Sequence, residues 1–237
     1  MLTAAARAYQ APFSVGMNAL PWPVPKLIEG PGCITKLPEL IRSQGKEKPL
    51  VVTDKVLHRE LGMLDSLKSK MDEIGMDYVM FDSVEPNPTD TCVYEGVELF
   101  KEKGCDCFIA CGGGSSMDAA KAIGAVAVKD KPVAKLQGLF KILRRIPTVF
   151  AVPTTAGTGS ETTVAALITE EATHHKASMN DTCLMPNFAV LDPELTVGLP
   201  PKVTSTTGMD ALCHAVESYT NATYMTRFEN QLAERAV

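Results

Sequence analysis

The 237-residue sequence lacks long apolar runs, an excess of positive charge and closely paired cysteines at a metal-binding spacing. No apolar stretch approaches the roughly 18 residues that are needed to cross a bilayer. The net charge of −5 argues against nucleic acid, because proteins that bind it cluster lysine and arginine to displace counterions. We therefore expect neither nucleic acid nor a membrane as a partner.

Export signals and disulfide patterns are also lacking. The N-terminal segment has no continuous apolar core of the kind that a signal peptide needs, although Arg7 and several alanines leave a transit peptide as an alternative. The seven cysteines are an odd number, and Cys105, Cys107 and Cys111 stand among apolar residues without a CxxC spacing. We interpret them as buried free thiols of a cytoplasmic protein.

What the sequence does contain is a regular alternation of strand-like and helix-like segments. Strands are predicted at "KPLVVTD", "MDYVMFD", "CDCFIAC" and "PTVFAVPTT", with helices between them, including one over 117–128. This alternation favours an α/β fold with a Rossmann-like parallel sheet covered by helices on both faces. We predict this domain over residues 1–200, with a lead-in over 1–25. Residues 201–237 are predicted to begin an all-helical domain.

Two glycine-containing loops follow predicted strands. In "CGGGSS", glycines between a strand and a helix start suit a phosphate, because glycine allows close approach and a helix N-terminus offers N–H groups. The loop is neither G-x-G-x-x-G nor a P-loop, so a tight packing turn stays open, and Ser115 and Ser116 could cap the helix instead. The second loop, "PTTAGTGSET", would lie on the same sheet edge. Together they predict a site for a long phosphorylated ligand.

A third motif, "DALCH", places Asp210 and His214 four residues apart on a predicted helix, so that both side chains project from one face. A carboxylate and an imidazole in this arrangement suit Fe²⁺ or Zn²⁺. Two ligands do not complete a metal site, and an ordinary surface pair is the alternative.

Seven motifs in order resemble the iron-containing (group III) alcohol dehydrogenase family. They are "PGCITKLPEL", "VVTDK", "EPNPT", "GGGSSMDAAKAIG", "PTTAGTGSE", "FAVLDPELTVGLPP" and "TGMDALCHAVESY". The resemblance implies an N-terminal NAD(P)-binding domain, a C-terminal helical domain and an active site between them. It also implies a metal-dependent dehydrogenase that transfers hydride reversibly between a nicotinamide cofactor and a small primary alcohol or aldehyde, as a homodimer.

Site residues follow from the resemblance position by position. Cofactor contacts are implied for Asp54, Asn87, Gly113, Gly114, Ser115, Asp118, Thr154, Thr155, Thr158 and Lys176. A carboxylate at position 54 would accept a bond from the ribose 2′-hydroxyl and repel a 2′-phosphate, which favours NAD over NADP. A capping role for that aspartate and a solvated role for Lys176 are the alternatives.

The metal assignment is the incomplete part of the resemblance. Asp210 and His214 match the family's first two metal ligands, and the other two, both histidines, are expected beyond Val237. Two other functions therefore stay open: a catalytically silent nucleotide-binding fragment, or a relative of glycerol dehydrogenases and dehydroquinate synthases, which share both loops but differ in metal ligands.

Overall fold

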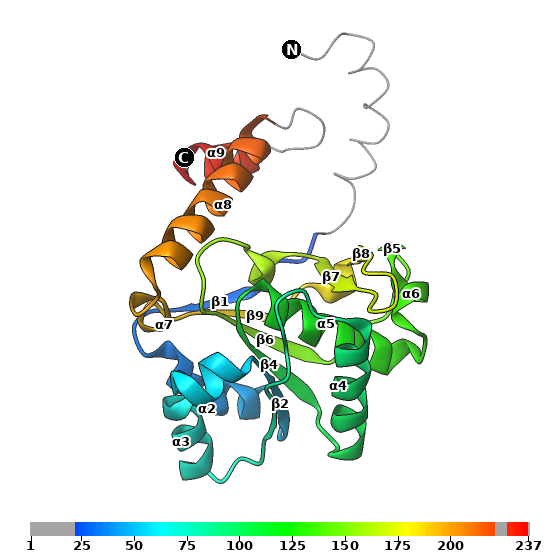
Figure 1. Cartoon of the computed structure of the whole chain (residues 1–237). Coiled ribbons are helices and arrows are strands. Elements are labelled where there is room, and N and C mark those ends of the chain that lie inside the picture. Colours follow the sequence, from blue (N-terminus) through cyan, green and yellow to red (C-terminus); the bar gives the residue numbers. More distant parts are fainter. Residues whose placement is uncertain (1–21, 221–226, 237) are drawn as a thin grey trace. The chain divides into compact units, whose positions relative to one another are not determined.

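The computed structural model describes residues 22–220 and 227–236 (Figure 1). The chain divides into two units. The larger comprises Val24–Thr155 and Gly159–Leu199, and the smaller includes Ala156–Thr158 and the chain from Pro200 onward. Most of the lead-in predicted at 1–25 lies outside the described residues.

A six-stranded parallel sheet forms the centre of the larger unit (Figure 1), which confirms the predicted α/β fold. Its strands, in spatial order, are β1 (Lys26–Glu29), β9 (Phe188–Leu191), β6 (Thr148–Pro153), β4 (Cys107–Gly112), β2 (Pro49–Val52) and β3 (Val79–Phe81).

Strand β4 shows why the central strands form. All six of its residues are buried, as expected for a parallel strand covered on both faces. Successive side chains alternate between faces, so Phe108 and Ala110 enter one hydrophobic cluster while Cys107, Ile109 and Cys111 enter the other. The cysteines of this strand are free and buried, which confirms their predicted role as small hydrophobic residues.

Helices cover both faces of the sheet. On one face lie α2 (Leu37–Ser43) and α3 (Asp65–Glu73), and on the other lie α4 (Asp90–Glu102) and α5 (Gly114–Lys129) (Figure 1). Helix α4 begins where the Thr89 hydroxyl accepts a hydrogen bond from the Cys92 N–H at 3.3 Å, a standard N-cap. Small residues dominate α5, and glycine at position 96 of α4 allows the two helices to pack closely, because an added β-carbon would lie 2.8 Å from Ile123 Cγ1.

Three further strands form a small second sheet beside α5. They are β5 (Gly138–Leu139), β8 (Lys176–Asn180) and β7 (Ala165–Thr169), with β7 and β8 antiparallel. The short elements of the larger unit are η1 (Cys33–Lys36), η2 (Val56–Glu60), α6 (Val133–Leu136), η3 (Ser160–Thr162), η4 (Thr182–Leu184) and α7 (Glu194–Val197).

The structure corrects the strand prediction in three places, the first of which is β9, a strand of the main sheet that was not among the four predicted. Strand β1 was not predicted because its residues are mostly exposed, and it pairs with β9, which follows more than 150 residues later. The second sheet was not predicted either, since its strands are short and only partly buried. The glycine loop therefore follows the fourth strand of the chain rather than the third.

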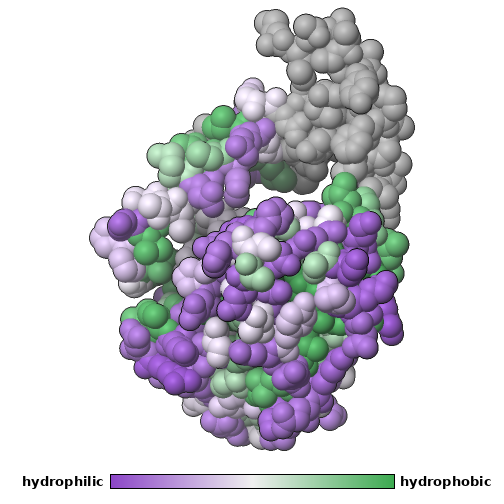
Figure 2. All heavy atoms as spheres, turned by 45° about the vertical axis from the view of Figure 1, so that its right-hand side comes forward, coloured by the Kyte–Doolittle hydropathy of each residue, from purple (hydrophilic) through white to green (hydrophobic). Residues whose placement is uncertain are grey.

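The smaller unit contains α8 (Pro201–Thr220) and α9 (Arg227–Ala236), which contact each other. Neither these nor the other described helices combine the length and apolar character required to cross a bilayer. On the face drawn in Figure 2, hydrophilic side chains predominate and hydrophobic ones are interspersed among them.

Candidate cofactor site

The order of the strands creates a crevice in the larger unit. The chain leaves β2 through α3 on one face of the sheet and leaves β4 through α5 on the other, although β2 and β4 are neighbours. In doubly wound folds, ligands bind at the carboxyl ends of the strands where the connections diverge in this way. A cavity of about 520 Å³ lies there, lined by the segments that follow β2, β3 and β4.

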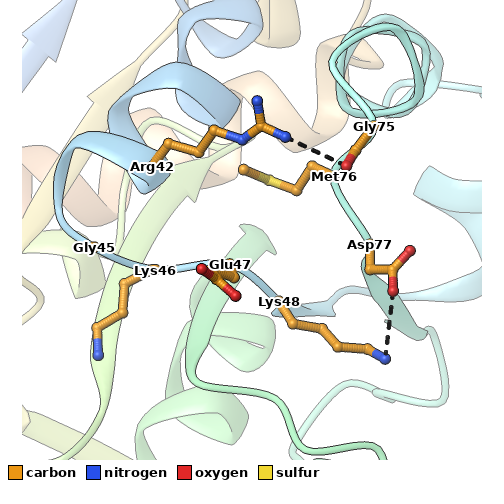
Figure 3. A pocket seen from close by; sticks show the side chains of 8 residues that line it. All are labelled: Arg42, Gly45, Lys46, Glu47, Lys48, Gly75, Met76 and Asp77. Carbon is orange, nitrogen blue, oxygen red and sulfur yellow. Dashed lines mark hydrogen bonds and ion pairs between the residues drawn. The ribbon is translucent and has the colours of Figure 1, made fainter.

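A second cavity of similar volume, about 470 Å³, lies at the opposite edge of the sheet (Figure 3). Its lining segments, Gly45–Lys48 and Gly75–Asp77, lead into the amino ends of β2 and β3. The Arg42 guanidinium donates a hydrogen bond there to the carbonyl of Ile74 at 2.6 Å. The two cavities are similar in volume and differ in position. Because ligands of doubly wound folds bind at the carboxyl ends of the strands, we assign the site to the cavity at that edge.

The first glycine loop ends β4 and begins α5 directly. Gly112 has φ +151°, a conformation that side-chain-bearing residues rarely adopt, and an added β-carbon would overlap Ser116 Oγ. Helix α5 begins at Gly114, three residues earlier than predicted, and its N-cap is Gly113, which offers no side-chain cap. The alternative that Ser115 or Ser116 caps the helix is therefore wrong. The first N–H groups of α5 have no partner within the helix and open on the cavity.

The second loop lies beside the first. The Thr154 N–H donates to the Gly112 carbonyl at 3.0 Å, which continues the pairing of β6 with β4. A β-carbon added to Gly113 would lie 3.6 Å from Thr155 Oγ1, a buried hydroxyl that has no hydrogen-bond partner. Thr158, also predicted to bind cofactor, belongs to the smaller unit.

These loops fit an anionic pyrophosphate. A buried hydroxyl without a partner is costly unless a ligand satisfies it, and the helix N-terminus supplies N–H groups and a positive dipole end. Gly113 and Gly114 line the cavity without side chains, so a ligand can approach their backbone closely. The residues present therefore suit a phosphate-bearing cofactor.

Asp54 lies at the carboxyl end of β2 and lines the cavity. Its Oδ1 accepts the Leu57 N–H at 2.9 Å, so the carboxylate caps the following turn and is held in place by it. Capping was the alternative to ribose binding, and the two roles are compatible because a carboxylate has a second oxygen.

Asp82, at the end of β3, contributes a further carboxylate to the cavity wall. It accepts two hydrogen bonds from Arg59, at 2.6 and 3.0 Å, and contacts His58 Nδ1 at 2.8 Å. The Arg59 hydrogen bonds, aided by His58, hold the pKa of Asp82 below its ordinary value despite burial. This cluster was not predicted from the sequence.

Two predicted cofactor residues meet although they lie 89 positions apart. Lys176 Nζ donates to Asn87 Oδ1 at 2.8 Å. Asn87 has φ +60° between two prolines, and the Thr169 N–H donates to the Pro88 carbonyl at 2.9 Å, which attaches the second sheet to this turn. The second sheet thus brings Lys176 to the carboxyl edge of the first.

Asp118, also predicted to bind cofactor, accepts hydrogen bonds from other residues of the chain through both carboxylate oxygens. Its Oδ1 accepts the Ser160 hydroxyl at 2.8 Å and its Oδ2 accepts the Leu167 N–H at 3.1 Å. Burial raises the pKa of Asp118, and Lys121 opposes that shift.

Lys121 is the functional candidate that sequence reasoning missed. Its side chain is fully buried one turn beyond Asp118 and hydrogen-bonds to the chain that follows the second loop. Burial lowers the pKa of Lys121 to about 8, against the attraction of Asp118 and Glu161. A single lysine within the apolar helix sequence "MDAAKAIGAVAV" was the available signal.

The predicted metal ligands lie on α8 in the smaller unit. Asp210 Oδ1 and His214 Nε2 are 3.8 Å apart, and about half of each side chain is exposed. Their donor types suit Fe²⁺ or Zn²⁺, yet the described parts of the chain contain no group of three or more His, Cys, Asp or Glu side chains placed to hold a metal. The pair is therefore half of a usual ligand set.

Comparisons with known proteins agree with this architecture. A family model, "Iron-containing alcohol dehydrogenase", matches residues 24–193. The NAD-dependent methanol dehydrogenase of Bacillus methanolicus is 41% identical over 195 residues, which are 82% of this chain and 51% of that protein. The choline dehydrogenase of Bacillus subtilis (strain 168) is 41% identical over 201 residues, 83% of this chain and 50% of that protein.

A solved structure shows the same fold. The alcohol dehydrogenase from Oenococcus oeni superposes with a TM-score of 0.86 at 34% identity, over 91% of this chain and 56% of that one. The chain thus spans about half the length of the curated relatives that it matches. On the family match and these likenesses together, this chain belongs to the iron-containing alcohol dehydrogenase family.

Proposed function

We propose that this chain binds NAD at the carboxyl edge of its parallel sheet and forms part of a metal-dependent alcohol dehydrogenase. The observation that carries the proposal is the partnerless buried hydroxyl of Thr155 beside Gly113, the N-cap of α5, which itself lines the cavity at the strand ends. When bound, the nicotinamide would supply hydride chemistry and a divalent metal would supply Lewis acidity.

Different residues of the chain would bind different parts of the cofactor. The N-terminus of α5, with Gly113, Gly114 and Ser115, would hold the pyrophosphate, and Thr154 and Thr155 would close over it. Asp54 would face the adenosine ribose, where its charge disfavours a 2′-phosphate. The bonded pair of Lys176 and Asn87 would lie towards the nicotinamide ribose, near Asp118.

The substrate proposed is a small primary alcohol or its aldehyde. The two relatives are named for methanol and for choline, so the proposal extends to this class and to no single member. Asp210 and His214 would contribute two ligands of the metal, and a homodimer stays a prediction from the resemblance.

The test is a titration of the 237-residue chain with NADH and NADPH, followed by nicotinamide fluorescence. We expect NADH to bind more tightly than NADPH, and the Asp54→Asn variant to reduce this preference about tenfold or more, since about 1.4 kcal/mol of removed repulsion is tenfold in affinity. Asparagine caps a turn as well as aspartate does, so this variant removes the charge and keeps the local structure. Failure of the wild-type chain to bind NADH refutes the proposal.

A second candidate function is a nucleotide-binding module without turnover of its own. It is favoured by the absence of three grouped metal ligands among the described residues. Metal analysis separates the two functions. Stoichiometric Fe²⁺ or Zn²⁺ that is lost in Asp210→Ala supports the dehydrogenase, whereas NADH binding without stoichiometric metal supports the module.

A further inference from the structure

Lys121 is placed to bind protein rather than ligand. Its side chain is fully buried, and its Nζ has five oxygen neighbours within hydrogen-bond distance. These are the carbonyls of Ser160 (2.6 Å), Thr163 (3.1 Å) and Ala165 (3.0 Å), and the hydroxyls of Ser160 (3.1 Å) and Thr163 (3.0 Å). An ammonium has three N–H donors, so these oxygens saturate it and leave none for a cofactor.

Asp118 extends this network. The Ser160 hydroxyl lies between the two charged groups, because it donates to Asp118 Oδ1 and accepts from Lys121. The other carboxylate oxygen accepts the Leu167 N–H, at the middle of β7. Helix α5, which begins at the first glycine loop, is thus joined by seven hydrogen bonds to four residues, Ser160, Thr163, Ala165 and Leu167, of the chain that runs from the second loop into β7.

Stability alone does not explain a lysine here. Its neighbours along α5 are small apolar residues, and burying an ammonium in such surroundings is costly unless every partner is supplied. A methionine of similar length would avoid that cost. What it would lose is the larger part of the attachment between the second loop and α5, because the three carbonyls and two hydroxyls would have no common donor and only the two Asp118 hydrogen bonds would remain.

We propose that Lys121 is a positioning residue for the cofactor: through Ser160, Thr163 and Ala165 it holds the second loop in the conformation that keeps Thr154 and Thr155 beside the first loop. This inference rests on the proposed function, since the ligand that benefits is NAD. The residue acts through the loop and touches no part of the cofactor.

The experiment compares Lys121→Met with Lys129→Met in the 237-residue chain. Lys129 lies in the last turn of the same helix, far along the sequence from the glycine loop, and so controls for loss of a lysine from α5. NADH affinity is measured by fluorescence titration. Hydrogen exchange without ligand is measured at the amides of Thr154 and Thr162, which donate to Gly112 and Gly159.

We expect Lys121→Met to weaken NADH binding about tenfold or more, which corresponds to a loop that is binding-competent for about a tenth of the time. The two amides should exchange faster in this variant while amides of the central strands keep their protection. Lys129→Met should change neither measurement. If Lys121→Met does not fold, Ser160→Ala decides: it keeps the carbonyl but removes the bridging hydroxyl, and should weaken NADH binding about threefold or more.

Two failures are distinguishable. If the wild-type chain does not bind NADH, the proposed function is wrong and the inference falls with it. If the wild-type chain binds and a folded Lys121→Met binds within twofold of it, or its loop amides exchange at the wild-type rate, only the positioning role is wrong. Unchanged NADH binding in a folded Ser160→Ala, where that variant decides, overturns it equally.

Discussion

Replacement of Gly112 by alanine tests the geometry of the first loop. The residue has φ +151°, and a β-carbon there would lie 2.8 Å from Ser116 Cβ and overlap Ser116 Oγ. Forcing alanine into this backbone conformation costs about 1–3 kcal/mol. Relieving the overlap with the first turn of α5 costs about 1–3 kcal/mol more, as for an overpacked core. We therefore expect Gly112→Ala to lower the free energy of unfolding by about 2–6 kcal/mol.

The matched control is Gly75→Ala, at a turn where φ is +61° and no atom lies within 4 Å of the added β-carbon. Only the backbone conformation is penalised there, by about 1–2 kcal/mol. Urea unfolding followed by far-ultraviolet circular dichroism measures both variants, and NADH titration of the folded fraction reports the effect on the loop. Equal losses of stability in Gly112→Ala and Gly75→Ala would refute the tight approach of the loop to α5.

Three further predictions concern packing, charge and the unused cavity. Gly96→Ala, which brings a β-carbon against Ile123, should lower the unfolding free energy by about 1–3 kcal/mol without changing NADH affinity in the folded protein. Asp82→Asn should lower the free energy of unfolding by about 1–3 kcal/mol at pH 7, because the acceptor of the hydrogen bonds from Arg59 is then no longer a charged carboxylate. The pKa of Asp82 is lowered in the folded state, so its stabilisation is present above the unfolded pKa near 4 and is lost as the pH falls through the folded value. In acid titrations of unfolding, the asparagine variant should therefore show a smaller fall than wild type, and an equal fall would contradict this role. Arg42→Ala, at the cavity on the amino edge, should leave the Kd for NADH within twofold of wild type, and a larger change would reopen that cavity as a ligand site.

Local sequence was sufficient where burial follows from the residue types themselves. The central strands β2 and β4 consist of apolar residues that need cover on both faces, and the glycine loop is bounded by a strand and a helix of small residues. Prediction of a parallel sheet therefore succeeded before any contact was known. The helix start was predicted three residues too late, because glycine and serine are typical of loops. Only the structure shows that Gly113 is the N-cap and that the helix begins at Gly114.

The site depended on contacts between distant segments. Nothing in the turn around Asn87 indicates that Lys176 donates to it, since the second sheet that joins them is made of short, half-exposed strands. The sequence did not single out Asp82, and only the structure shows that Arg59 and His58 contact its carboxylate at the end of β3. The metal ligands are the converse case, since their i and i+4 spacing is readable in the sequence while the described structure adds no third donor.

The sequence by itself determined the α/β class, the two loops and the family, because periodicity, glycine placement and ordered motifs are local properties of the chain. Tertiary structure alone decided which residues line the cavity at the carboxyl edge, that Thr155 has a buried hydroxyl without a partner, and that Lys121 is saturated by five oxygen atoms. The physical reason is that hydrogen-bond satisfaction and burial are properties of surroundings. From sequence alone, a lysine in a helix is expected on the surface, and only the tertiary structure shows that the side chain of Lys121 is buried.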